Sequence, residues 1–216
     1  MPDHTRDTLV VFMRWPDIGR CKTRLEPVLG AADTRRLYRA MVEKTFAAAH
    51  PLSTLGKHIV AYVEPADRCN DVAEWLGSGL SVWPQPEGDL GSRCRHAMRR
   101  AFDEGAKRVA IIGSDLPHIS PLLLAEAFSV LREQAAVIGP AADGGFWLLG
   151  LSRELPDTFD GVPWSTREAL AGLQKQLAAA GVVAHMLPVL RDVDTPDDLA
   201  AVLPEWRDWL SGESNG

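Results

Sequence analysis

The stretch Arg108–His118, RVAIIGSDLPH, decides how this sequence can fold. Its Val109–Ile112 segment is short, apolar and mostly β-branched, which is typical of a strand buried on both faces of a parallel sheet. The strand must end before Pro117, which cannot continue the hydrogen-bond ladder. Asp115 therefore follows a central strand, and the carboxyl ends of such strands are where open α/β sheets bind their ligands.

Asp115 has a structural alternative, because an aspartate after a strand can simply cap the next helix. Ser120 fits that role better, since Pro121 then occupies the first helical position. We therefore predict that Asp115 has a functional role.

The composition is that of one soluble globular domain of 216 residues with a sizeable core. A net charge of −6 leaves no basic excess for general nucleic-acid binding. The three cysteines have no metal or disulfide spacing, which suits a reducing cytosol. The polar amino terminus is unlike a signal peptide, and no apolar run is long enough to form an integral membrane segment. We predict a single domain over residues 1–210 and a disordered tail over 211–216.

Apolar runs and helical periodicity alternate along the chain, which predicts an α/β fold. Besides 109–112, strands are expected at 8–13, 58–63, 80–83, 136–139, 146–151 and 182–190. Helices are expected at 31–49, near 67–76, up to about 104, and around 124–131. Ser165–Glu168 has the pattern of a capping box that opens another helix, and Thr195 is expected to cap the last one, in which Trp206 and Trp209 would be packing residues. The result is a mixed, mostly parallel sheet flanked by helices.

The segment that follows the first strand carries four basic residues: Arg14, Arg20, Lys22 and Arg24. Guanidinium and ammonium groups in such a loop can bind phosphate oxygens, so the loop is a candidate anion site. It is not a P-loop, because the required glycine and lysine spacing is absent. A solvated basic loop is the alternative.

Two glycine-containing loops are further candidates. Gly88, Asp89 and Gly91 precede a helix, and glycines allow a ligand to approach the backbone closely. An ordinary turn with Asp89 as the helix N-cap is the alternative. The other loop, Asp143-Gly144-Gly145, lies between two apolar runs and first of all indicates a hairpin turn.

Asp115 and Asp194 each follow a predicted strand, although they are far apart in the sequence. Thr195 as N-cap and Pro196 at the first helical position explain the neighbours of Asp194 but not Asp194 itself. A parallel sheet brings strand ends to one edge, so both carboxylates should face the basic loop. Mg²⁺ or Mn²⁺ needs only one or two such carboxylates when phosphate and water supply the other ligands.

The order of these motifs resembles the bacterial DUF2064 family, within the GT-A (nucleotide-diphospho-sugar transferase) superfamily. The matching segments are Phe12–Leu25, Gly88–Arg93, Gly113–Pro117, Gly139–Gly150, Trp164–Thr166 and Asp192–Leu199. The resemblance implies a single-domain, Rossmann-like GT-A sandwich. It also implies that Lys22 and Arg24 contact nucleotide phosphates and that Asp115 and Asp194 hold the metal.

The same resemblance assigns the remaining candidates. Arg14 and the Gly88, Asp89 and Gly91 loop would contact the nucleotide. Asp143, Gly144, Gly145 and Trp164 would line the acceptor side. Cys21 replaces a usual aliphatic residue and Phe146 a common tyrosine, but neither change removes a charge that the chemistry needs.

The leading functional hypothesis is a metal-dependent transferase that moves a sugar from a nucleotide-diphospho-sugar to a small or lipid-borne acceptor. If the anomeric centre inverts, a carboxylate must deprotonate the acceptor, and Asp143 is the candidate. The segment before Asp115 lacks the Asp-x-Asp motif of many GT-A glycosyltransferases, which keeps a second hypothesis open. KTRL, SDLP and DTPDDL are similar to segments of nucleotidyltransferases acting on phospholactate or molybdopterin, which suggests that an NTP is joined to a phosphorylated small molecule. A third hypothesis is a non-catalytic nucleotide-binding module.

Overall fold

A computed structural model describes residues 6–77 and 79–202, and the predictions for Trp206, Trp209 and the 211–216 tail lie outside these residues. Seven strands form one sheet in the order β3-β2-β1-β4-β6-β5-β7. They are β1 (Thr8–Arg14), β2 (His58–Glu64), β3 (Ser81–Pro84), β4 (Val109–Ile112), β5 (Ala136–Pro140), β6 (Phe146–Leu151) and β7 (His185–Met186). A strand is therefore present within each of the seven predicted segments, although the last one is only two residues long.

The sheet is mixed, as expected, because one hairpin reverses the chain. β1, β2, β3 and β4 pair in parallel, whereas β6 runs antiparallel to both β4 and β5. β4 is buried along its whole length, which explains its continuous apolar sequence. The carboxyl ends of β1, β2, β3 and β4 and the start of β6 consequently meet at one edge of the sheet.

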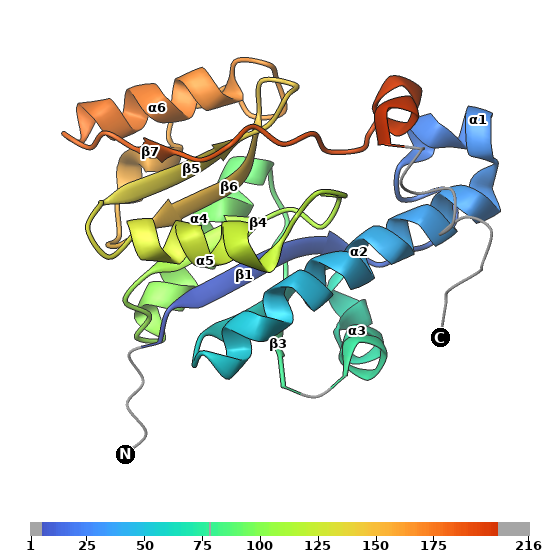
Figure 1. Ribbon diagram of the computed structural model, residues 1–216, viewed down its shortest axis with the longest axis horizontal. Coiled ribbons are helices and arrows are strands. Elements are labelled where there is room, and N and C mark those ends of the chain that lie inside the picture. Colours follow the sequence, from blue (N-terminus) through green and yellow to red (C-terminus); the bar gives the residue numbers. More distant parts are fainter. Residues whose placement is uncertain (1–5, 78, 203–216) are drawn as a thin grey trace.

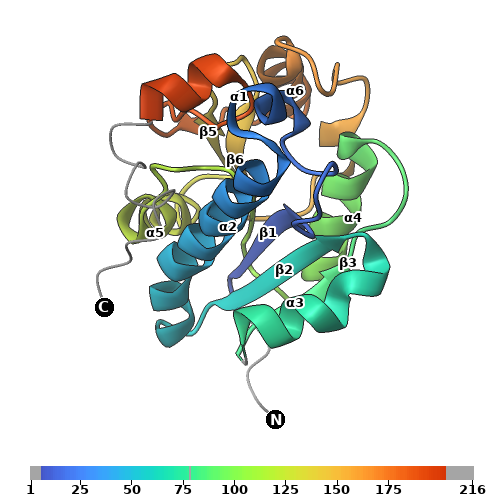
Figure 2. The ribbon, with the colours of Figure 1, turned by 90° about the vertical axis from the view of Figure 1, so that its right-hand side faces the viewer.

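Helices cover both faces of the sheet (Figure 1). α2 (Ala31–Thr54), α3 (Cys69–Leu76) and α5 (Pro121–Val130) contribute to one apolar core, and α4 (Leu90–Asp103) and α6 (Ala169–Ala179) contribute to the other. Figure 2 shows α2 and α5 on one side of β1 and α4 on the other. The short elements are α1 (Glu26–Leu29), η1 (Thr23–Leu25), η2 (Ala66–Arg68) and η3 (Pro156–Phe159). Both views place the helical residues 196–202 beside α1.

Three local predictions differ from the structure. The last strand is not 182–190, because only His185–Met186 joins the ladder, with an isolated bridge at Leu190. This segment pairs with one neighbouring strand, β5, and Pro188 has no N–H to donate. The helix expected at 31–49 continues to Thr54 and contains Pro51.

The third difference is the capping box predicted at Ser165–Glu168, which is wrong. α6 begins at Ala169, and Glu168 before it makes no side-chain cap bond. Ser165 is left-handed, with φ of 60°, and the Thr166 hydroxyl donates to the Pro163 carbonyl at 2.8 Å. The segment therefore turns before the helix starts, and the Leu170 amide, already inside α6, donates to the Gly144 carbonyl at 3.2 Å. The other predicted caps, Ser120 and Thr195, are present.

Candidate functional site

Two cations and two carboxylates alternate in a charged network at the carboxyl edge of the sheet. Lys22 Nζ lies 2.6 Å from Asp115 Oδ2 and 3.5 Å from Asp194 Oδ1. Arg24 Nη1 lies 2.7 Å from Asp194 Oδ2. The fold thus brings together the loop after β1, the end of β4 and the segment before residues 196–202, as the sequence predicted for these four residues.

Lys22 occupies the centre of this network and is the most enclosed of its members. Its side chain is only 9% exposed, and its backbone is left-handed with φ of 52°, a conformation that non-glycine residues rarely adopt. Burial lowers the pKa of Lys22, but the Asp115 and Asp194 carboxylates outweigh it, so the pKa is raised above its usual value. The ammonium group therefore remains a fixed positive charge at neutral pH.

The residue that precedes Asp115 belongs to a buried polar pair. The preceding residue, Ser114, is 3% exposed, and its hydroxyl lies 3.1 Å from the Tyr38 hydroxyl on α2. The Tyr38 oxygen also accepts from the Arg14 backbone N–H at 2.9 Å, which ties the ends of β1 and β4 together. Tyr38 did not emerge from the sequence, although a polar residue on the apolar face of a predicted helix was a usable signal.

A further carboxylate, Asp192, belongs to this site and was missed by the sequence analysis. Burial and the charges of Asp115 and Asp143 raise the pKa of Asp192 to about 6. Asp115, Asp194 and Asp192 therefore all interact electrostatically with Lys22, and Asp143 interacts with Asp192. The pattern Asp192-Val193-Asp194, with Val193 fully buried, was the signal that could have found it.

The raised pKa of Asp192 predicts a pH-dependent stability. The folded protein holds the Asp192 proton more tightly than the unfolded chain, in which the pKa is 3.8. The stabilisation is therefore complete below about pH 4 and is lost as the pH rises to about 6. Asp192→Asn should be more stable than the wild type above pH 6, by about 1–2 kcal/mol after solvent screening. Urea unfolding of both proteins from pH 4 to pH 8 measures this, and a pH-independent difference would contradict it.

The donor chemistry of the network fits a hard divalent cation. Asp115 and Asp194 supply carboxylate oxygens, the ligands that Mg²⁺ and Mn²⁺ prefer, and both approach the same lysine nitrogen. Over residues 6–77 and 79–202, no three His, Cys, Asp or Glu side chains form a group that could hold a metal. A cation would therefore share these two carboxylates with Lys22, and the metal assignment remains a prediction.

The predicted nucleotide loop lies at the start of α4. Asp89 is the N-cap of this helix and accepts from the Ser92 backbone N–H at 2.8 Å, so the structural alternative for Asp89 is confirmed. Gly88 is left-handed, with φ of 127°, as a tight turn before a helix requires. Arg14 is the last residue of β1, and its Nε lies 2.9 Å from Glu64 Oε2. Nucleotide binding by these residues stays a prediction.

Trp164, predicted on the acceptor side, packs directly against Gly91 in the first turn of α4. A Cβ at Gly91 would overlap the Trp164 indole, so only glycine permits this approach. The indole is stacked on Phe159 and meets Phe146 edge-on. Gly91 was predicted to contact the nucleotide and Trp164 the acceptor, yet both residues line one hollow of about 290 Å³.

Gly91→Ala should therefore destabilise the fold by about 1–3 kcal/mol, because the added methyl group must displace a packed tryptophan. Urea unfolding provides the measurement. The Gly91→Ala and Trp164→Ala double-mutant cycle should show coupling, since the clash disappears with the indole. An unchanged unfolding midpoint for Gly91→Ala would contradict the close contact.

The turn between β5 and β6 is the predicted hairpin. Asp143 Oδ1 accepts from the Gly145 backbone N–H at 2.8 Å, and Gly144 has φ of 94°. A side chain at Gly144 would overlap the Arg167 carbonyl, so the turn is packed against the start of α6. Asp143 itself is exposed. Its proposed role as a base stays a prediction.

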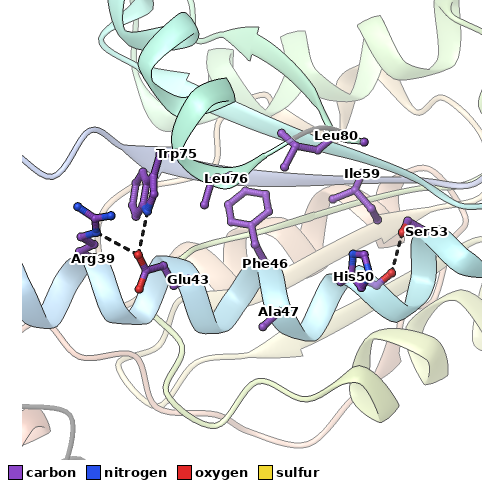
Figure 3. A pocket seen from close by; sticks show the side chains of 11 residues that line it. Arg39, Glu43, Phe46, Ala47, His50, Ser53, Ile59, Trp75, Leu76 and Leu80 are labelled. Atoms are coloured by element: carbon purple, nitrogen blue, oxygen red, sulfur yellow. Dashed lines mark hydrogen bonds and ion pairs between the residues drawn. The ribbon is translucent and has the colours of Figure 1, made fainter. Parts of the chain in front are cut away.

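A larger cavity of about 530 Å³ lies away from the charged network, between α2 and the segment that joins α3 to β3 (Figure 3). None of the predicted site residues lines it. Its polar groups largely satisfy one another: Glu43 Oε1 accepts from Trp75 Nε1 at 2.8 Å and from Arg39 Nε at 3.0 Å. The candidate site is therefore the charged edge of the sheet and not this cavity.

Comparison with known proteins agrees with this fold. Across the described residues, no helix is long and apolar enough to cross a membrane. A phosphoenolpyruvate guanylyltransferase of Mycolicibacterium paratuberculosis (strain ATCC BAA-968 / K-10) is 30% identical over 189 residues, covering 85% of this chain and 81% of that protein. Another, from Streptosporangium roseum, is 30% identical over 204 residues, covering 91% and 84%.

A solved structure shows the same architecture. The crystal structure of a protein from Desulfovibrio desulfuricans G20, provisionally described as a nucleotide-diphospho-sugar transferase, superposes with a TM-score of 0.85. It is 31% identical and covers 96% of this chain and 97% of that one. The model of the DUF2064 family, "Uncharacterized protein conserved in bacteria", matches residues 33–166. This chain, with its nucleotide-diphospho-sugar transferase-type fold, is thus a member of the DUF2064 family.

Proposed function

We propose that the protein is a nucleotidyltransferase that joins an NTP to a phosphorylated small molecule and releases pyrophosphate. The observation that carries the proposal is the Lys22, Asp115, Asp194 and Arg24 network at the carboxyl edge of β1 and β4. Fixed cations beside carboxylates suit a triphosphate whose negative charge grows as pyrophosphate departs. The relatives named phosphoenolpyruvate guanylyltransferase support this chemistry and suggest a phosphorylated carboxylic acid as the acceptor.

In this reaction an oxygen of the acceptor phosphate attacks the α-phosphorus of the NTP. The bond from the α-phosphorus to the bridging oxygen breaks, and pyrophosphate carries away the electron pair. Lys22 and Arg24 would orient the phosphates and stabilise the leaving charge. Because the acceptor phosphate is already an anion, the step needs no general base, and Asp143 has no required role in it.

Asp115 and Asp194 are the residues that would hold Mg²⁺ or Mn²⁺. When bound, the cation would add positive charge at the phosphate oxygens. Lys22 would then exchange part of its contact with the two carboxylates for contact with phosphate. Asp192, half-buried and electrostatically coupled to Asp115, would supply additional negative charge.

Sugar transfer, the leading hypothesis from the sequence, becomes the second candidate. The name of the D. desulfuricans structure favours it. The local geometry favours it less, because the first position of an Asp-x-Asp motif ending at Asp115 is Gly113. A Cβ there would lie 2.8 Å from Asp115 Oδ1, so this position accommodates a side chain only if the Asp115 carboxylate moves.

The two candidates release different products, and this difference is the test. The purified protein is incubated with Mg²⁺ or Mn²⁺, each NTP and phosphorylated carboxylic acids such as phosphoenolpyruvate, and pyrophosphate is measured. Parallel reactions contain nucleotide-diphospho-sugars, and nucleoside diphosphate is measured. Pyrophosphate release that depends on the acceptor supports the proposal. Nucleoside diphosphate release from a nucleotide-sugar, without pyrophosphate release from any NTP, would replace it with sugar transfer.

A further inference from the structure

The Lys22 ammonium group contacts both of the carboxylates that would hold a divalent cation. Lys22 Nζ lies 2.6 Å from Asp115 Oδ2 and 3.5 Å from Asp194 Oδ1. Arg24 Nη1 lies 2.7 Å from the other oxygen of Asp194, Oδ2. Both oxygens of Asp194 and one oxygen of Asp115 are therefore already paired with a positive charge.

The backbone of Lys22 is held on both sides, so an exchange of partners is a movement of its side chain. The preceding residue, Cys21, is buried, and its Sγ donates to the Asp17 carbonyl at 3.3 Å. The Lys22 carbonyl accepts from the N–H of the fully buried Leu25 at 2.8 Å. These anchors maintain the left-handed backbone of Lys22, a conformation that is costly for a side-chain-bearing residue.

The two contacts of Lys22 oppose the binding of a free divalent cation. A cation that took the same carboxylate oxygens would lie beside an ammonium group whose side chain is only 9% exposed. Like charges repel more strongly where little water screens them. Displacing Lys22 also costs its two ion pairs, and a free cation brings no negative charge to replace them.

A polyphosphate changes this balance, because it brings negative charge together with the cation. Lysine has a flexible four-carbon stem and three rotatable donors, so the ammonium group can move from the carboxylates to phosphate oxygens while its backbone stays in place. Arg24, which is 72% exposed, can turn to the phosphates in the same way. Asp115 and Asp194 then become available to the cation that accompanies the phosphates.

We propose that Lys22 prevents Asp115 and Asp194 from binding a free divalent cation tightly until the phosphates of an NTP draw its ammonium group away. The cation and the NTP consequently strengthen each other's binding, and this coupling is reciprocal. The inference rests on the proposed function, because it describes how the same site takes up its NTP and cation. It also predicts a gain: removing the charge of Lys22 improves the binding of free Mn²⁺.

Mn²⁺ binding without nucleotide tests the inference without any turnover. Dissociation constants are measured from the electron paramagnetic resonance signal of free Mn²⁺ for the wild type, Lys22→Met and the double variant Lys22→Met/Asp115→Asn. Lys22→Met should bind Mn²⁺ about tenfold or more tightly than the wild type, because the competing ammonium group is gone. The double variant should lose this gain, because an amide replaces the Asp115 carboxylate.

Lys57→Met is the matched control, since Lys57 is also a largely buried lysine paired with a carboxylate, that of Asp7. It should bind Mn²⁺ like the wild type. Urea unfolding establishes that each variant is folded. Equal Mn²⁺ affinities of the wild type and folded Lys22→Met would overturn the inference.

A second measurement uses the wild type alone and does not depend on the folding of any variant. Equilibrium dialysis gives the dissociation constant of each NTP in EDTA and with Mn²⁺. At least one NTP should bind about tenfold or more tightly with Mn²⁺, and equal affinities under both conditions would overturn the inference. If the wild type binds no NTP under either condition, the proposed function fails and the inference with it. An NTP that binds with Mn²⁺, together with an unchanged Mn²⁺ affinity in Lys22→Met, overturns the inference alone.

Discussion

Lys22→Met should lower pyrophosphate release by about 100- to 1,000-fold, the usual cost of removing one preorganised group that stabilises transition-state charge. Within the four-residue network, only the buried ammonium group of Lys22 contacts both Asp115 and Asp194. Methionine preserves much of the side-chain volume but removes the charge. The loss should therefore appear mainly in kcat, measured with saturating NTP and acceptor.

Lys57→Met is the matched control for this variant. Lys57 is also a largely buried lysine, 11% exposed, whose Nζ lies 2.7 Å from Asp7 Oδ2. Its partner, however, precedes β1, at the opposite edge of the sheet. Both variants should lose stability in urea unfolding, but only Lys22→Met should lose activity. Equal activities of the two variants would show that Lys22 is merely structural.

Asp115→Asn should have the second large effect, and it separates the carboxylate from the ammonium group. We expect pyrophosphate release to fall by about 100-fold or more, because the neutral amide neither fixes Lys22 by charge nor binds a divalent cation well. Mn²⁺ binding, followed by the electron paramagnetic resonance signal of free Mn²⁺, should weaken in parallel.

The control for Asp115→Asn is Asp7→Asn, which removes a carboxylate paired with Lys57 and Arg108 far from the site. It should bind Mn²⁺ like the wild type and be destabilised by about 1–3 kcal/mol. Unchanged Mn²⁺ affinity in Asp115→Asn would remove Asp115 from the predicted metal site. The role of Lys22 would still be tested separately, by Lys22→Met.

Much of the fold follows from local patterns in the sequence. The apolar run at Val109–Ile112 predicted a central strand because a strand with helices on both faces has no polar side. The Asp143-Gly144-Gly145 turn predicted the reversal into β6. The sequence could not place the end of the last strand, because the pairing of His185–Met186 depends on one neighbouring strand and not on its own residues.

The sequence predicted those site residues whose charged side chains come soon after a predicted strand. Asp115, Lys22 and Arg24 meet because β1 and β4 are adjacent parallel strands that end at the same edge. Asp194 does not follow a strand end as predicted: β7 ends at Met186 at the far edge of the sheet, and the segment after it reaches the site, where the Val193 N–H donates to the Asp115 carbonyl at 3.2 Å. Asp192 was missed, because the effect of an acid depends on its burial and on partners from distant segments. The contact of Gly91 with Trp164 likewise depends on how the segment before α6 packs against α4.

The most direct test of the account follows the α-phosphorus itself. An NTP labelled with ³²P at the α-position is incubated with the protein, Mg²⁺ and a phosphorylated carboxylic acid, and the products are separated. Nucleotidyl transfer predicts that the label moves to a new compound that contains the acceptor, while the pyrophosphate is unlabelled. Label that stays in the unreacted NTP, together with release of nucleoside diphosphate from a nucleotide-sugar, would contradict it.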